Sequence, residues 1–117
     1  MSAGSPTAQQ EATHDLRVCA LDDIRPGEPL KVELAGLAPL AVYLVEGEVY
    51  VTDDTCTHGK ASLGEEGELN GFLITCTWHD GVYDIRTGEP KQMPCTESLR
   101  IYPAIVRDGC VYIQTPR

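Results

Sequence analysis

Long apolar runs are missing from this chain of 117 residues. The longest candidate, AGLAPLAVYLV at 35–45, contains Pro39 and is shorter than the roughly 18 apolar residues that a membrane span needs. The first residues, MSAGSPTAQQEATHD, contain no basic stretch followed by an apolar one and no paired arginines. They therefore resemble neither a secretory nor a twin-arginine signal, and we expect a soluble, cytoplasmic protein.

Basic residues are also scarce, since 9 Lys and Arg stand against 18 Asp and Glu, for a net charge of -9. This balance disfavours nucleic acids and anionic membrane surfaces as partners. Either the acidity steers the protein toward a basic patch on another protein, or it only maintains solubility. The acidic segment GEEGE at 64–68 is the candidate contributor to steering.

A sustained helical period is absent as well, whereas short apolar or alternating runs recur between glycine- and proline-rich turns. Asp108-Gly109 is a strong two-residue hairpin signal, because glycine accepts a positive φ. The expected strands cover 16–20, 30–34, 39–45, 48–52, 71–76, 81–85, 99–106 and 110–114. The pattern predicts an all-β fold, a small antiparallel sandwich or stacked antiparallel sheets, in a single domain over 15–117. Residues 1–14, including His14, are expected to form a disordered, solvated tail.

Five cysteines in a chain without a recognisable signal argue against a disulfide framework, because cytosolic thiols stay reduced. Three of them, Cys19, Cys95 and Cys110, lie in apolar or turn contexts. We expect these three to be small buried hydrophobic residues.

The other two cysteines each stand close to a histidine, as Cys56-x-His58 and Cys76-x-x-His79, with 17 residues between the pairs. Each pair follows an expected strand and so belongs on a loop at the end of a sheet. Two thiolates and two imidazoles suit either a tetrahedral zinc ion or an iron-sulfur cluster. Each loop carries one ligand of each kind, which favours a two-iron cluster with both cysteines on one iron and both histidines on the other.

The stretch from Cys56 to Pro90 resembles the Rieske cluster-binding motif, C-x-H followed by C-x-x-H. The tail HDGVYDIRTGEP and the downstream MPCT and YPAIVRDGCVYI are similar to small Rieske ferredoxins, so the resemblance covers residues 16–115. It implies a Rieske-like β-sandwich with a cluster-binding subdomain of two loops at about 54–90. It also implies one [2Fe-2S] cluster.

The resemblance implies ligand roles: Cys56 and Cys76 hold the inner iron, and His58 and His79 the outer, more exposed iron. Leu63 would shield the cluster or simply fill the core.

Three further residues have roles only through the resemblance. Gly81 would let its loop approach the sulfides, and Trp78 would cover the cluster or form a docking anchor. The Tyr83 hydroxyl would donate to a cluster cysteine, or belong to a core aromatic with its hydroxyl in solvent.

Two departures separate the chain from the Rieske subunits of respiratory complexes. Ala61 and Trp78 stand where those subunits carry an extra cysteine pair, and Gly81 stands where they carry a serine that bonds a sulfide. Both losses imply a potential in the lower half of the Rieske range.

The implied function is that of a ferredoxin, a one-electron carrier and not an enzyme. It would pass electrons from an NAD(P)H-dependent flavin reductase to the terminal oxygenase of an aromatic-ring-hydroxylating dioxygenase system, as a monomer. One alternative is a Rieske-like small subunit permanently bound to a larger redox enzyme. The other is a structural zinc module.

Overall fold

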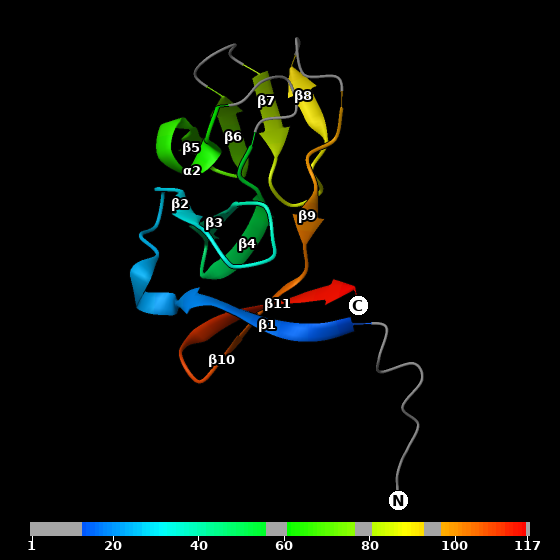
Figure 1. Cartoon of the computed structure of the whole chain (residues 1–117). Helices are drawn as coiled ribbons and strands as arrows, with labels where there is room; N and C mark the ends of the chain where they lie inside the picture. Colours follow the sequence, from blue (N-terminus) through cyan, green and yellow to red (C-terminus); the bar gives the residue numbers. More distant parts are fainter. Residues whose placement is uncertain (1–12, 56–60, 77–80, 93–96, 117) are drawn as a thin grey trace, which may run out of the picture.

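The computed structural model describes residues 13–55, 61–76, 81–92 and 97–116. These residues form three antiparallel sheets, which lie one above another in Figure 1, and two very short helices. The all-β, antiparallel fold class expected from the sequence is confirmed. No helix in the part of the chain that the structure describes is long and apolar enough to cross a membrane.

The bottom sheet in Figure 1 joins the two ends of the described chain in the order β1-β11-β10. Its strands are β1 (Thr13–Ala20), β10 (Ala104–Arg107) and β11 (Cys110–Pro116). Asp108 and Gly109 connect β10 to β11 with φ of 54° and 76°, so the expected two-residue hairpin is confirmed. The pairing of β1 with β11 runs from Thr13 to Ala20 and includes His14, which the sequence had placed in the tail.

The middle sheet has the order β2-β3-β4-β9. Its strands are β2 (Leu30–Val32), β3 (Leu40–Val45), β4 (Glu48–Asp53) and β9 (Ile101–Tyr102), and the short 3-10 helix η1 (Leu21–Asp23) links β1 to it. Successive side chains of a strand point to opposite sides of its sheet, and those of β3 are buried on both sides because a core lies on each. Leu40 and Val42 face one core, and Ala41 and Tyr43 face the other.

The top sheet has the order β5-β6-β7-β8 and contains Cys76, one of the four expected ligands, at the end of β6. Its strands are β5 (Glu68–Asn70), β6 (Leu73–Cys76), β7 (Gly81–Asp84) and β8 (Pro90–Gln92), preceded by the one-turn helix α2 (Leu63–Glu66).

Two hydrophobic cores separate the three layers. The lower core, between the bottom and middle sheets, consists of Val18, Cys19, Ile24, Leu40, Val42, Val51, Val111 and Ile113. The upper core, between the middle sheet and the top sheet with α2, consists of Ala41, Tyr43, Ala61, Leu63, Ile74, Cys76, Tyr83, Ile85 and Leu99.

The predicted strands need three corrections. The run at 99–106 forms two strands in two different sheets, because Pro103 interrupts it. Strand β9 pairs with β4 in the middle sheet, and β10 pairs with β11 in the bottom sheet. The segment at 59–70 was expected to be a connection without strands, and its described part holds α2 and β5. Strand β8 was missed because it begins at Pro90, and proline is tolerated on an edge strand such as this one.

Candidate metal centre

The second ligand loop lies at the tip of a regular hairpin. Strands β6 and β7 pair in one unbroken register from Leu73 with Asp84 to Cys76 with Gly81. The chain therefore leaves the sheet at Cys76 and returns to it at Gly81. The expected ligand His79 and the residue Trp78 fall between these positions and lie outside the described residues, so their roles stay predictions.

The first ligand loop has a different base. An isolated antiparallel bridge joins Thr55 to Ser62, and between them lie Cys56 and His58, which are outside the described residues. Ser62 also caps α2, since its hydroxyl accepts a hydrogen bond from the backbone N–H of Glu65 at 3.1 Å.

Asp54, directly before this loop, is a residue that the sequence analysis missed. Its carboxylate Oδ1 accepts the backbone N–H of Gly64 at 2.6 Å, and its carbonyl accepts that of Leu63 at 2.8 Å. Its own N–H donates to the carbonyl of Pro39 at 3.0 Å. Nothing in the sequence distinguishes Asp54 from Asp53, yet only 2% of Asp54 is exposed.

The upper core brings the two loop bases together. Ala61 and Leu63, from the end of the first loop, pack in the same cluster as Cys76 and Tyr83, from the hairpin of the second. Cys76, the one expected ligand that the structure describes, is 1% exposed. A thiol at this place is screened from solvent by the core around it.

The other described residues of the predicted site also lie at this junction. Leu63 is fully buried in the upper core, and Gly81 is buried at the hairpin end. Tyr83 is 0% exposed, so the reading in which its hydroxyl faces solvent is wrong. Its proposed hydrogen bond to a cluster cysteine stays a prediction.

The cysteines outside the two pairs differ in burial. Cys19 is buried in the lower core, as expected, and burial raises the pKa of its thiol to about 11. Cys110 is only half-buried, because it lies on the outer side of the bottom sheet's central strand, so that expectation was wrong. Cys95 lies outside the described residues. Cys19 belongs to the lower core, whereas the expected ligand Cys76 belongs to the upper core.

An ion pair closes the far end of the second hairpin. Arg86 donates Nη2 to Oδ2 of Asp84 at 2.9 Å and Nε to Oδ1 at 3.1 Å, and its guanidinium lies 4.2 Å from the centroid of the Phe72 ring. These hydrogen bonds hold the pKa of the Asp84 carboxyl below its ordinary value. The sequence showed this segment only as part of a family-like turn, RTGEP.

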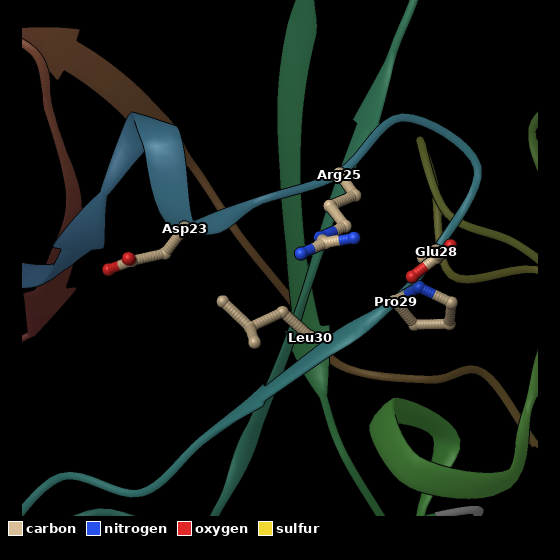
Figure 2. A pocket seen from close by; sticks show the side chains of 5 residues that line it. All are labelled: Asp23, Arg25, Glu28, Pro29 and Leu30. Carbon is tan, nitrogen blue, oxygen red and sulfur yellow. The ribbon is translucent and has the colours of Figure 1, made fainter.

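Two cavities among the described residues lie away from the two loop bases. One, of about 110 Å³, is lined by Asp23, Arg25, Glu28, Pro29 and Leu30 from the segment between η1 and β2 (Figure 2). The other, of about 240 Å³, lies along β4, β9 and β10. Neither is lined by residues of the ligand loops.

The donor chemistry fits a two-iron cluster. Two cysteines and two histidines are the ligands that such a centre takes, and the described scaffold closes both loops and packs their bases in one core. Within 13–55, 61–76, 81–92 and 97–116, no group of three or more His, Cys, Asp or Glu side chains forms a metal site. Three of the four expected ligands fall outside these ranges.

Known proteins match the chain over most of its length. The model of the family described as "Rieske [2Fe-2S] domain" matches residues 14–103. The ferredoxin component of the p-cumate 2,3-dioxygenase system of Pseudomonas putida is 47% identical over 96 residues, which cover 82% of this chain and 81% of that protein.

Solved structures agree with the sequence matches. The ferredoxin of Sphingomonas yanoikuyae B1 is similar with a TM-score of 0.84 and 43% identity, over 88% of this chain and 100% of that one. A chain in the complex of reduced oxygenase and oxidized ferredoxin in carbazole 1,9a-dioxygenase has a TM-score of 0.78 and 46% identity, over 85% and 91%.

Proposed function

The chain belongs to the Rieske [2Fe-2S] domain family, and on that premise we propose that it carries electrons from an NAD(P)H-dependent flavin reductase to a terminal ring-hydroxylating oxygenase. It is a Rieske electron carrier with one [2Fe-2S] cluster, and its relatives are named as ferredoxin components of dioxygenase systems and not as the oxygenases. The observation that carries the proposal is the 47% identity to such a component over four fifths of both chains.

We assign the four cluster ligands as Cys56, His58, Cys76 and His79. The assignment is supported by the burial of Cys76 and by the two closed loop bases that meet in the upper core. When bound, the cluster supplies a centre that takes up and releases one electron at a time. A centre with two thiolates carries less negative charge than one with four, which makes the uptake easier.

The protein part has two tasks in this chemistry. It presents the loops at one end of the top sheet, within cluster-binding residues at about 54–90, and it excludes water from the side of Cys76. We further propose that Trp78, between two ligands, contributes to covering the cluster or to docking, and that Gly81 lets the second loop approach the sulfides.

Charge supports a basic protein partner. The net charge is -9, and Glu65, Glu66 and Glu68 are exposed on α2 and on β5, an edge strand of the top sheet. Acidic groups near a docking face steer a basic partner during encounter. We propose a monomer that acts in the cytoplasm, where reduced nicotinamide cofactors are available to the reductase.

The two alternatives have less support. The family match is to a [2Fe-2S] domain, which sets the zinc module aside. A permanently bound subunit has less support because the relatives carry the name ferredoxin, whether as a component or as a subunit of a dioxygenase system.

Reconstitution tests the proposal. The purified chain is mixed without oxygen with NADH and the flavin reductase of a ring-hydroxylating dioxygenase system, and its absorbance and electron paramagnetic resonance are recorded. We expect a red-brown protein with about two irons and two sulfides per chain. Its paramagnetic signal should appear only on reduction, and with a limiting amount of NADH it should decline when the oxidised oxygenase of the p-cumate or carbazole system is added.

Two results would overturn the proposal. Stoichiometric zinc without sulfide would remove the cluster. A cluster that takes electrons from no flavin reductase and gives none to an oxygenase, while the protein elutes as a stable complex from its native host, would favour the permanent subunit.

A further inference from the structure

We propose that Asp54 is a positioning residue for the cluster, which holds the first ligand loop by joining its two ends through a buried carboxylate. The proposal rests on the proposed function, because it concerns the loop that carries Cys56 and His58.

The contacts of Asp54 cross the loop. Its carboxylate accepts the Gly64 N–H at 2.6 Å and its carbonyl accepts the Leu63 N–H at 2.8 Å. Asp54 stands two residues before Cys56, and Gly64 stands six residues after His58. Together with the bridge from Thr55 to Ser62, these bonds fix where the loop starts and where it ends.

Asp54, the acceptor of the hydrogen bond from Gly64, is itself held in place by a backbone contact. The N–H of Asp54 donates to the carbonyl of Pro39, the residue directly before β3, at 3.0 Å. Asp54 is therefore attached to the middle sheet, and the loop inherits that position.

The donor end is anchored by close packing. A Cβ added at Gly64 would lie 2.7 Å from the backbone N and Cα of Lys31, so α2 begins in direct contact with β2. The Lys31 ammonium adds ion pairs to Glu65 at 3.5 Å and Glu33 at 3.7 Å. Gly64 therefore has no room to move together with Asp54. The carboxylate joins two positions that are each held by other contacts.

The second ligand loop needs no such residue. Backbone pairing continues up to Cys76 and Gly81, so the β-ladder itself fixes both ends of that loop. For the first loop, backbone pairing ends at Asp53 and resumes only as one isolated bridge. The Asp54 side chain supplies the missing connection.

Asp53 offers a matched control. It carries the same carboxylate one position earlier, and its Oδ1 accepts the Tyr102 hydroxyl at 2.6 Å on β9, away from the loop. Replacing either aspartate by alanine removes one negative charge and one hydrogen bond at nearly the same place in the chain. Only the change at Asp54 releases the loop.

The test compares Asp54→Ala, Asp54→Asn and Asp53→Ala with the unmodified protein, all carrying their clusters. The g-values of the reduced cluster, its reduction potential and its rate of loss in air are measured. We expect Asp54→Ala to shift the g-values and to lose the cluster about tenfold faster, the scale of one lost hydrogen bond to a charged group. Asp53→Ala should stay within about twofold on the same scale.

Asp54→Asn keeps an oxygen acceptor of the same shape, so its g-values and cluster lifetime should lie close to those of the unmodified protein. If Asp54→Ala does not fold, altered g-values or a shorter cluster lifetime in Asp54→Asn would still overturn the proposal. Equal shifts in potential for Asp54→Asn and Asp54→Ala, with unchanged g-values and lifetimes, would overturn the proposal in favour of a charge effect alone.

Unchanged g-values and lifetime in Asp54→Ala would also overturn it, as would the same loss in Asp53→Ala. If the unmodified protein contained no iron and sulfide, the proposed function would have failed instead. The two failures are therefore distinguishable from the metal content of the unmodified chain.

Discussion

The two ligand loops rest on different kinds of support. The second is the tip of a hairpin whose four residue pairs run without interruption to Cys76 and Gly81. The first is closed by one isolated bridge and by the side chain of Asp54. One site can therefore combine a loop held by regular backbone pairing with a loop held by individual contacts, provided that a shared core joins their bases.

The largest expected effect tests whether the two loops contribute equally despite this difference. Cys56→Ser and Cys76→Ser should each prevent normal assembly of the cluster, because in the proposed assignment each removes one thiolate from the same iron. Iron, sulfide and the visible spectrum would be measured. Cys19→Ser, Cys95→Ser and Cys110→Ser are the controls and should keep the spectrum. A Cys95→Ser protein as colourless as Cys76→Ser would show that the ligands are wrongly assigned.

The next effect concerns the turn between β7 and β8, where Gly88 has a φ of 82° and a Cβ would lie 2.0 Å from the Leu99 carbonyl oxygen. Gly88→Ala should lower the free energy of unfolding by roughly 2–4 kcal/mol, through backbone strain and overpacking. Urea unfolding measures it.

Gly109→Ala is the matched control, since Gly109 has a similar φ of 76° with no atom near the added Cβ. It should cost only the strain of about 1–2 kcal/mol. Equal costs for the two variants would mean that the hairpin does not depend on its contact with Leu99.

A smaller effect concerns acid. Because hydrogen bonds from Arg86 lower the pKa of Asp84 in the folded state, their stabilisation is present above the carboxyl's unfolded value near 3.8. It is lost as pH falls through the lower folded value. The free energy of unfolding of the native protein should therefore decline over this acid range more steeply than that of Asp84→Asn. A difference between the two proteins that does not change with pH would contradict this ion pair.

The smallest effect concerns the potential. If the buried Tyr83 hydroxyl donates to a cluster cysteine, Tyr83→Phe should lower the reduction potential by some tens of millivolts, where 59 mV corresponds to about 1.4 kcal/mol. Tyr43→Phe is the control, because Tyr43 is equally buried in the upper core but its hydroxyl bonds Thr52 at 2.9 Å. Voltammetry at one pH decides: a change below about 10 mV would leave Tyr83 a packing role only.

The elements that could be predicted from the sequence are those that local patterns determine. The hairpins were predictable because alternating strands and the turn at Asp108-Gly109 are local patterns. The split at Pro103 was not, because which sheet each half joins depends on distant partners. Strand β5 has three residues and α2 one turn, and both are stabilised by packing against the upper core more than by their own propensities.

The candidate site divides in the same way. The spacing of cysteine and histidine indicates a cluster, since ligand types are visible in the sequence. The supports are not visible: Asp53 and Asp54 are identical neighbours, and only the fold turns one toward Tyr102 and the other toward Gly64. Burial likewise separates Cys19 from Cys110, although both stand in strands of the same sheet.

The most direct test is pulsed electron paramagnetic resonance of the reduced protein with ¹⁵N-labelled histidine. The chain has three histidines, at positions 14, 58 and 79. If each loop contributes one histidine to the same cluster, two nitrogens should be strongly coupled. Both should remain in His14→Ala. Replacing His58 or His79 should remove one of the two couplings or the cluster itself. One coupled nitrogen, or none, would contradict a cluster held between the two loops.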